Sequence, residues 1–498
     1  MIGAISNIYL LIFLPLIASL CCQILVGKKP TFYWALFTST LLFILALKTF
    51  PLVLNSEKIA SDFQLSLVSI AIEFKLDLLG ITFLLLLLFI KIVTLFFFRT
   101  DIEKFLDEKS SRAFYSVFLL NLFALVGIFT SNNLFNLFFF FEIYSFSFFA
   151  ITSISSDLKL LKISFRYFCL SAASSLIIIF CFFGIYLVFG EVNFDAMAQN
   201  FHLLGKKNIW FAQVIFLLLA GAIFMRFFPL WLYFKKLRSS SVIASFFIQD
   251  ALFIKTLVGV FLALKFVYFF FGNNLVFEKI NFAPLLILIA IALIFYSAIN
   301  LYRQKHLKLI CIYFCLNNLG FMLAAIALQS VESMQALFFY ILNFALVNFF
   351  IFIFASFLKR YFHTSSINKI WLLRRNHMAL TLPVKLLVFC IIAFPLSLIF
   401  LGNWYMALSS FTPNFAATIL GALIASNFVY VAVAIRLIDS FFQPHNSPEM
   451  PVLPARNYYS YLLSFWFLIG GIYVGMLLCG QLNSLSLRFA SYLFSNTI

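Results

Sequence analysis

Four charged side chains stand in stretches of the sequence that are otherwise apolar. Glu142 lies within FFFFEIYSF, Arg226 within AGAIFMRFF, and Asp250 and Lys255 within IQDALFIKTL. A charge at the centre of a membrane helix costs about 2.5–3.5 kcal/mol, so such residues are usually functional. Burial disfavours a charged lysine and a nearby carboxylate favours it, which suits a proton relay. A set of static ion pairs between helices is the alternative.

Asp250 and Lys255 are five residues apart, which places them about 140° apart around an α-helix. We therefore expect them to face different partners. Other charges in apolar stretches have a simpler interpretation. Lys91 can extend along its own helix. The remaining ones, near helix ends where a long side chain reaches the membrane surface at little cost, are Arg166, Lys308 and Lys385.

The composition indicates that a membrane surrounds these residues. The chain has 498 residues, of which 64% are hydrophobic and 10% are charged, whereas a soluble domain is about half apolar and a quarter charged. Repeated apolar stretches of roughly 20 residues predict an all-α, polytopic membrane protein. The predicted helices, about fourteen in number, cover residues 8–26, 32–54, 76–98, 113–131, 134–154, 164–190, 209–233, 240–270, 281–301, 307–328, 333–359, 379–403, 412–438 and 459–481.

Lysine and arginine are unevenly distributed between the loops. Most of the 34 lie in loops that join an odd-numbered helix to the next even-numbered one, and the positive-inside rule places those loops in the cytoplasm or matrix. Both termini then face the other side, and the net charge of +17 reflects topology rather than a nucleic-acid partner. The eight cysteines have no zinc-site spacing, so no metal is predicted. We interpret many of the 73 phenylalanines as lipid-facing.

Two prolines stand inside predicted helices. Pro229 lies in the seventh and Pro395 in the twelfth. Each removes a backbone hydrogen bond and kinks or breaks its helix. Broken helices at membrane depth usually line a polar cavity in transporters, although a packing kink is the simpler alternative.

Two passages resemble subunit 2 of NADH:ubiquinone oxidoreductase, the respiratory complex I. The first is SNNLFNLFFFFEIYSFSFFA followed by KISFRYFCLSAASSLIIIFCFFGIYLVFGEVNF, and the second is RQKHLKLICIYFCLNNLGF. With AFPLSLIFLGN they span about residues 130–405. Glu142 falls on the glutamate of the family's fifth helix, and Gln304 and Lys308 match its QxxLK motif. Asn318 stands where the family usually has histidine.

The departures from the family pattern concern its lysines. Phe224 stands where the seventh helix usually has lysine, and the nearest cation is Arg226, which is effectively never deprotonated. Aligned with the sister subunits of the family, Lys255 falls on the central lysine and Gln249 on the neighbouring histidine, which is the alignment we favour. Aligned with subunit 2 itself, the lysine would fall near Leu252. Asn403 replaces the terminal lysine of the twelfth helix and has no titratable proton.

The resemblance implies a fold of two inverted five-helix repeats, helices 4–8 and 9–13, with helices 7 and 12 broken. The domains it implies are helices 1–3 (residues 1–110), the first repeat (111–271), the second repeat (280–440), and helix 14 with its tail (441–498). The implied proton-path residues are Glu142 as the modulating carboxylate, Arg226 as its cationic partner, and Lys255 and Lys308 as relay lysines. Secondary candidates are Asp250, Gln249, Gln304, Lys385 and Asn403.

The resemblance also implies a function, a location and partners. It implies proton translocation across the inner mitochondrial membrane by a mitochondrially encoded subunit with both termini in the intermembrane space. Quinone reduction would drive it from other subunits, which hold the FMN, the iron–sulfur clusters and the ubiquinone, because no such binding motif is present here. Implied partners are a subunit 4-type neighbour, small membrane subunits and phospholipids such as cardiolipin. Two alternatives stay open: a membrane scaffold that has lost pumping, and a stand-alone cation/proton antiporter.

Overall fold

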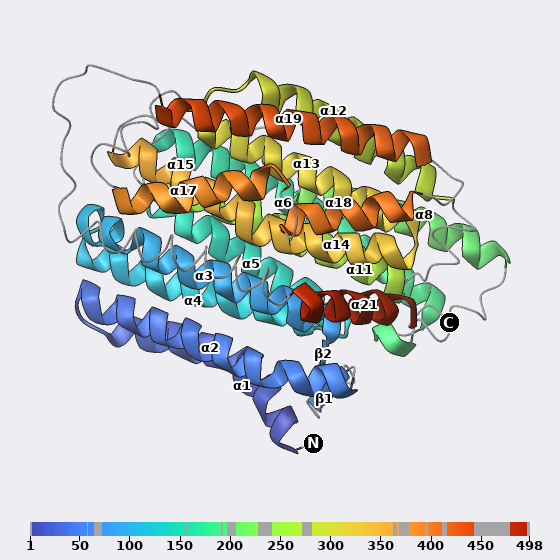
Figure 1. Cartoon of the computed structure of the whole chain (residues 1–498). Coiled ribbons are helices and arrows are strands. Elements are labelled where there is room, and N and C mark those ends of the chain that lie inside the picture. Colours follow the sequence, from blue (N-terminus) through green and yellow to red (C-terminus); the bar gives the residue numbers. More distant parts are fainter. Residues whose placement is uncertain are drawn as a thin grey trace. The chain divides into compact units, whose positions relative to one another are not determined.

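The structure is a computed structural model that describes residues 2–56, 58–63, 72–155, 157–190, 193–196, 206–227, 242–270, 281–361, 366–367, 378–393, 397–410, 416–442 and 479–495. Within these ranges eleven helices are long and apolar enough to cross a membrane (Figure 1). Two shorter apolar helices cover Gln213–Arg226 and Leu398–Ser409. The prediction of an α-helical, polytopic membrane protein is confirmed. The last predicted span, 459–481, lies almost entirely outside the described residues.

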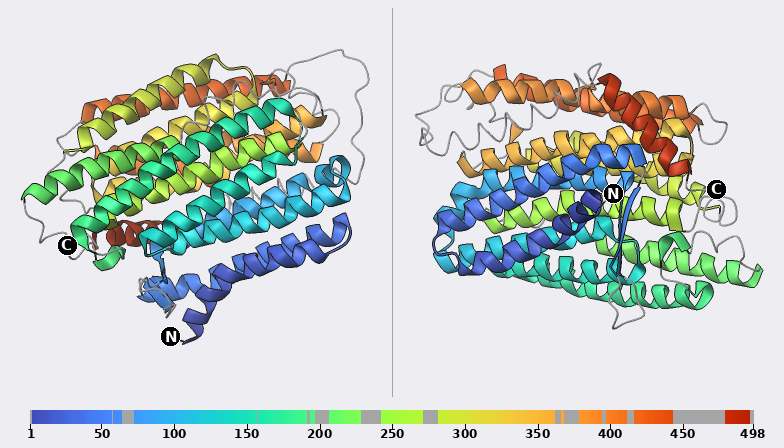
Figure 2. Two further views of the ribbon diagram at one scale, coloured as in Figure 1. Left: turned by 180° about the vertical axis from the view of Figure 1, so that it is seen from behind. Right: turned by 90° about the horizontal axis from the view of Figure 1, so that it is seen from below.

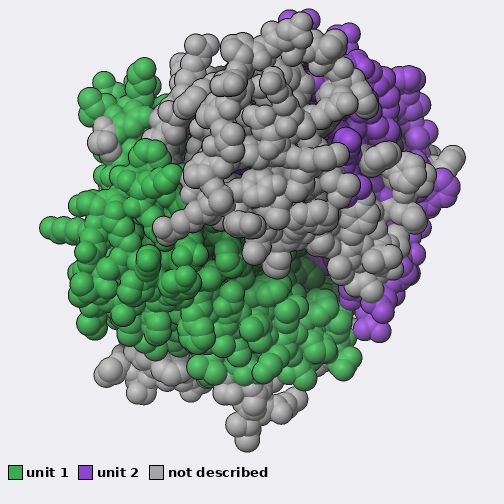
Figure 3. Space-filling view, turned by 60° about the vertical axis from the view of Figure 1, so that its left-hand side comes forward, with its two compact units in different colours: residues 1–280, 492–498 green, residues 281–491 purple. Residues whose placement is uncertain are grey.

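The chain divides into two compact units, Met1–Ile280 with Tyr492–Ile498, and Asn281–Ser491 (Figure 3). The inverted-repeat relationship expected between the two halves stays a prediction. Unit 1 contains, in chain order, α1 (Ile2–Ile24), α2 (Lys28–Ser56), β1 (Lys58–Phe63), β2 (Ile72–Asp77), α3 (Leu78–Phe105), α4 (Glu108–Thr130), α5 (Leu134–Ser153), α6 (Leu158–Phe189), α8 (Lys206–Phe227), α10 (Val242–Gln249), the π-helical turn η2 (Asp250–Ile254), α11 (Lys255–Leu264) and the π-helical segment η3 (Lys265–Phe270).

Helices of unit 1 run side by side, as both views of Figure 2 show for α1 to α5. In addition α6 packs on α8, and α10 and α11 pack on α3. Polar residues cap these helices where they begin. Asp77 accepts a hydrogen bond from the backbone N–H of Gly80 at the start of α3, and Asn133 accepts one from Phe135 at the start of α5. Such caps satisfy N–H groups that have no partner inside the helix.

Unit 2 contains α12 (Ala283–Arg303), α13 (Leu307–Leu328), α14 (Val331–Asn343), the π-helical turn η5 (Phe344–Asn348), α15 (Phe349–Tyr361), α17 (Met378–Ile391), α18 (Leu398–Ser409), α19 (Ala416–Phe442) and most of α21 (Cys479–Ser495). α12 packs along α13, and α14 packs along α18. At Gly320 in α13 a Cβ atom would lie 2.6 Å from Ile294 Cγ1 and 3.1 Å from the carbonyl oxygen of Ala290. The small residue therefore permits the close approach of α12.

The predicted interruption of the twelfth helix is present, because α17 ends at Ile391 and α18 begins at Leu398. Pro395 itself lies outside the described residues. In the predicted seventh helix, α8 ends at Phe227, and Pro229 also lies outside the described residues. The structure therefore describes the helix end before each proline and not the proline conformation.

Three expectations from the sequence need correction. A two-stranded antiparallel hairpin, β1–β2, adds to the expected all-α fold. The third helix continues to Phe105, beyond its predicted end at residue 98. Many phenylalanines also fill the interior instead of facing lipid. The rings of Phe129 and Phe261, for example, meet edge to face at 4.8 Å, and both side chains are fully buried.

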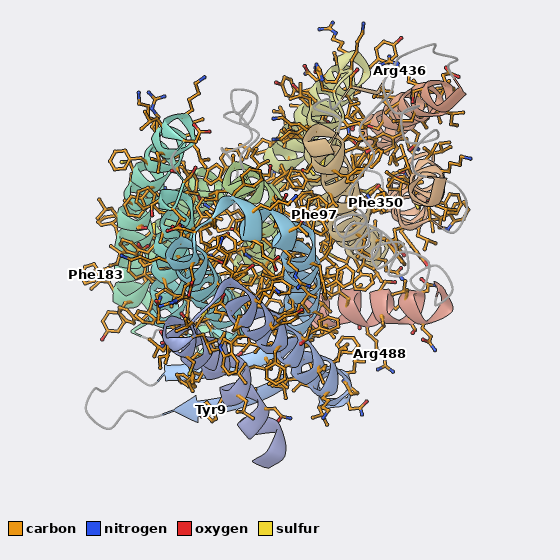
Figure 4. All side chains as sticks on the ribbon, turned by 90° about the vertical axis from the view of Figure 1, so that its left-hand side faces the viewer. Tyr9, Phe97, Phe183, Phe350, Arg436 and Arg488 are labelled. Carbon is orange, nitrogen blue, oxygen red and sulfur yellow. The ribbon has the colours of Figure 1, made fainter. Side chains whose placement is uncertain are left out.

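The outward face of α6 does carry exposed apolar side chains, including Phe180 and Phe183. Figure 4 shows Phe183 pointing away from the ribbon, whereas Phe97 of α3 is buried. The same residue type therefore serves both surface and core.

Candidate functional site

Fully buried charged side chains are confined to unit 1 among the described residues. The buried polar side chains of unit 2 are those of serine, asparagine and glutamine. The buried charged residues are Lys75, Asp77, Lys91, Asp101, Arg226, Asp250, Lys255 and Lys265. Charge chemistry at membrane depth is therefore concentrated in unit 1.

Arg226 at the end of α8 pairs with Glu142 of α5, with 3.1 Å between Nη2 and Oε1. Nη2 also donates to the carbonyl oxygen of Phe141 at 2.9 Å and to Ser145 Oγ at 2.7 Å, and Nη1 donates to Ser175 Oγ at 2.5 Å. The Ser175 hydroxyl in turn lies 2.6 Å from Glu142 Oε1. These contacts fix the guanidinium, which cannot release a proton.

Lys255 at the start of α11 is completely buried, and its Nζ has no hydrogen-bond partner among the described residues. Aromatic rings surround Nζ instead. Nζ lies 3.4 Å from the ring centre of Tyr167, 3.6 Å from that of Phe148 and 5.7 Å from that of Tyr144. Aromatic faces attract a cation and contribute about 2 kcal/mol or more where water is excluded. We call these three rings the aromatic cage.

Asp250 forms an ion pair with Lys91 of α3, and both side chains are buried. The expectation that Lys91 extends along its own helix is therefore wrong, because its side chain is buried and pairs with the Asp250 carboxylate. Lys91 Nζ also donates to Asn121 Oδ1 at 2.9 Å. The second oxygen of Asp250 accepts a hydrogen bond of 3.0 Å from the Tyr144 hydroxyl. Asp250 and Lys255 do have different partners, as expected.

The backbone between Asp250 and Lys255 is a π-helical turn and not an α-helical one. The backbone N–H of Lys255 bonds to the carbonyl oxygen of Asp250 across this turn. Since a π-helical turn holds an extra residue, the two side chains lie closer to one face than the 140° expected from α-helical geometry. The sequence alone shows no signal for this turn.

Lys265 is a further buried cation that was not among the predicted site residues. It lies in η3 and donates to the carbonyl oxygen of Ser131 at 2.6 Å. In the same part of unit 1, Lys75 of the β1–β2 hairpin forms an ion pair with Asp195 at 2.5 Å, and Asn132 Nδ2 donates a hydrogen bond to Asp195 at 3.0 Å. The apolar run GVFLALKFVYFF around Lys265 is the signal that could have identified it.

The other predicted residues occupy varied environments. Gln249 is buried and donates to Thr94 Oγ1 at 2.7 Å. Gln304 directly follows the last residue of α12, and Lys308 lies half-buried in the first turn of α13. Lys385 is exposed on α17, which fits its interpretation as a side chain that reaches the membrane surface. Only Gln249 of these four lies in unit 1.

Neutral amides take the place of charges inside unit 2. Asn403 accepts a hydrogen bond from Tyr340 at 2.8 Å and donates to Asn427 at 2.9 Å. Asn317 accepts one from Tyr430 at 2.6 Å and donates to Ser297 at 2.9 Å. Further buried amides, with side-chain atoms that lack a partner among the described residues, are Asn318, Asn343 and Asn348.

Three curated relatives are similar to parts of this chain. A putative antiporter subunit mnhA2 of Staphylococcus saprophyticus is 23% identical over 53% of this chain and 32% of its own length. The NADH-quinone oxidoreductase subunit N of a Wolbachia from Brugia malayi is 26% identical over 42% and 44%. A Na(+)/H(+) antiporter subunit of Alkalihalophilus pseudofirmus is 24% identical over 72% and 69%. The chain spans less than half the length of the first two.

Solved structures share the fold over almost the whole chain. A chain of the Mrp complex from Dietzia sp. superposes with a TM-score of 0.81, at 14% identity and 100% coverage of both chains. A chain of respiratory complex I from Thermus thermophilus gives a TM-score of 0.74, at 18% identity, covering 98% of this chain and 99% of that one. These identities show the fold and nothing more specific.

The match to a protein family covers residues 131–428, more than half of the chain. This range includes Glu142, Arg226, Asp250 and Lys255 and excludes Lys91. The family is described as NADH:quinone oxidoreductase/Mrp antiporter, transmembrane. The chain therefore belongs to the family of membrane subunits shared by NADH:quinone oxidoreductases and Mrp antiporters.

Proposed function

We propose that this chain is subunit 2 of a mitochondrial NADH:ubiquinone oxidoreductase and takes part in proton translocation across the inner membrane. The observation that carries the proposal is Lys255, an amine buried without a hydrogen-bond partner among the described residues and flanked by two ion pairs. A lysine in such a site changes its charge readily, because burial favours its neutral form and the nearby Asp250 carboxylate favours its charged form.

Each neighbour of Lys255 has a separate role in this proposal. Arg226 stays charged and, with Glu142, sets a constant field beside the lysine. The aromatic cage stabilises the protonated form of Lys255 without accepting its proton. Lys255 is then the group that binds and releases the proton, and Lys308 continues the relay in unit 2.

The redox chemistry belongs to partner subunits in this proposal. The chain contributes to the enzyme only as part of the complex, whose other subunits hold the FMN, the iron–sulfur clusters and the ubiquinone. The neighbours we propose are a subunit 4-type membrane subunit and small membrane subunits, with phospholipids such as cardiolipin between them. The termini lie on the intermembrane-space side.

A second candidate function is a membrane scaffold that has lost pumping. The observation that favours it is the set of neutral amides in unit 2, where Asn403 replaces the lysine of the family pattern and forms hydrogen bonds to Tyr340 and Asn427. A stand-alone cation/proton antiporter is a third, supported by the antiporter subunits among the relatives.

The test compares Lys255→Met with Lys162→Met in the assembled complex, reconstituted in vesicles. Lys162 is an exposed lysine of α6 and serves as the matched control. We expect Lys255→Met to lower the number of protons translocated per NADH oxidised and Lys162→Met to leave it unchanged. An unchanged ratio in an assembled Lys255→Met complex favours the scaffold. Purification of the chain without redox subunits favours the stand-alone antiporter.

A further inference from the structure

We propose that Asp250 is an exchangeable counter-ion, shared in turn by Lys91 and Lys255, and that Lys91 is a further proton-exchanging residue of this chain. The inference rests on the proposed function and adds a residue from α3, outside the matched family range. In the described state Asp250 is paired with Lys91, and Lys255 is left to the aromatic cage.

The Glu142–Arg226 pair is poorly suited to act as the switch. The guanidinium has four acceptors from α5 and α6, namely Glu142, Phe141, Ser145 and Ser175. Moving it would break several hydrogen bonds to a charged group, each contributing about 1.5–3 kcal/mol. Since arginine also never deprotonates, this pair supplies a constant charge and not a changing one.

The Asp250–Lys91 pair has fewer restraints, and both members are titratable. Apart from the carboxylate, the described hydrogen-bond partner of Lys91 Nζ is Asn121 Oδ1, with the rings of Phe118 and Phe246 at 5.3 and 5.6 Å. A lysine in this site is satisfied by one carboxylate and one amide. Loss of the carboxylate leaves the ammonium group largely unsolvated, which favours release of its proton.

Asp250 is also placed to reach Lys255. The two residues are the ends of one π-helical turn, and the Lys255 N–H bonds to the Asp250 carbonyl oxygen. The groups around Lys255 are Tyr144 and Phe148 on α5, Tyr167 on α6 and the charges of Arg226 and Asp250. Asp250 is the anion among them. The Tyr144 hydroxyl already bonds to one Asp250 oxygen while its ring belongs to the cage, so it links the two sites.

The exchange step conserves protons and charge. In the first state Lys91 is an ammonium paired with the Asp250 carboxylate, and Lys255 is a neutral amine. A water or hydronium donates a proton to Lys255 Nζ, the carboxylate turns to the new ammonium, and Lys91 gives one proton to water. One N–H bond forms at Lys255 and one breaks at Lys91. The cluster of three groups has a net charge of zero before and after the exchange.

The sharpest variant is Lys91→Arg, which preserves the ion pair but cannot give up its proton. We expect the complex to assemble and the number of protons translocated per NADH to fall as far as with Lys255→Met, since arginine holds its proton far beyond the range of lysine. A ratio equal to that of the unaltered complex overturns the exchange. The matched control is Arg112→Lys, which changes a cation at the start of α4.

A second variant tests the exchange in case Lys91→Arg does not assemble, because the site around Lys91 is fully buried. The double substitution Lys91→Met with Asp250→Asn replaces the ion pair by a neutral pair of similar volume, and such replacements are often neutral for stability. The exchange predicts loss of translocation in an assembled double variant, because Lys255 has no counter-ion to receive. A static ion pair predicts full translocation, which would refute the proposal.

Lys255→Met separates this inference from the proposed function. If Lys255→Met leaves translocation unchanged, both the proposed function and the exchange of Asp250 are wrong. If Lys255→Met lowers the number of protons translocated per NADH while Lys91→Arg and the double variant leave it unchanged, the proposed function stands and only the exchange is wrong.

Discussion

The side-chain nitrogen Nζ of Lys255 lies 3.4 Å from the centre of the Tyr167 ring, and the hydroxyl of the same tyrosine donates to the backbone carbonyl of Arg226. One side chain of α6 therefore contacts both the caged lysine and the end of α8 that carries the arginine. The effects of the ring and of the hydroxyl can be separated, because a Tyr167→Phe substitution keeps the ring and removes the hydroxyl. This relationship gives a direct test of the aromatic cage.

We expect Tyr167→Phe to retain most proton translocation and Tyr167→Leu to reduce it several-fold. The phenylalanine ring still faces the ammonium group, whereas leucine removes an attraction of about 2 kcal/mol for a cation shielded from water. Translocation per NADH by the reconstituted complex measures the difference. Equal activity of the two variants would show that the ring does not act on Lys255.

Arg226 is expected to be more important for stability than for proton transfer. Arg226→Lys keeps a cation beside Glu142 but cannot reach the Phe141 carbonyl and the Ser145 and Ser175 hydroxyls together. Each hydrogen bond lost at a buried polar group costs about 1–3 kcal/mol. We expect the melting temperature of the complex to fall with Arg226→Lys and to fall further with Arg226→Met, which leaves the carboxylate unpaired.

The exposure of Glu142 limits the second effect. Its side chain is 28% exposed, so solvent screens part of the cost of an unpaired carboxylate. If Arg226→Met melts at the same temperature as Arg226→Lys, the ion pair contributes nothing beyond the hydrogen bonds. If neither variant changes the melting temperature, the contacts of the guanidinium are not needed for stability.

The close packing of α12 on α13 predicts a strong effect at Gly320. A methyl group there would lie 2.6 Å from Ile294 and 3.1 Å from a backbone carbonyl oxygen, whereas at Gly421 of α19 nothing lies within 4 Å. Overpacking of this kind costs about 1–3 kcal/mol. We expect Gly320→Ala, but not Gly421→Ala, to lower the amount of assembled complex on native gels. Equal assembly of both variants would contradict the packing described for unit 2.

The sequence predicted the large-scale fold because hydropathy determines it. A span such as Leu307–Leu328 is recognised from apolar length alone, and the structure reproduces its predicted limits. The interruption of the twelfth helix also followed from one proline. The hairpin was missed because Lys58–Phe63 and Ile72–Asp77 are short and lie between helices, where hydropathy gives no signal.

One pair of the site was predictable and the other was not. Glu142 and Arg226 stood out as charges in apolar runs and were expected to be partners, and the structure places them together. The partner of Asp250 was missed because Lys91 is far from it in sequence and because long lysines often reach the membrane surface. No local pattern distinguishes a lysine that does so from one that is buried against a carboxylate. That distinction depends on the packing of α3 against α10.

Asn403 tests whether the second unit transfers protons through its own side chains. The amide accepts from the Tyr340 hydroxyl and donates to Asn427, and neither bond involves a titratable carboxylate or amine. Asn403→Ala removes both bonds, each contributing about 0.5–1.5 kcal/mol, so we expect a lower melting temperature. Because the amide has no proton to exchange, we expect the number of protons per NADH to change far less than with Lys255→Met. A loss of translocation as large as that of Lys255→Met, in a complex that still assembles, would instead indicate that Asn403 and Asn427 orient a proton path through unit 2.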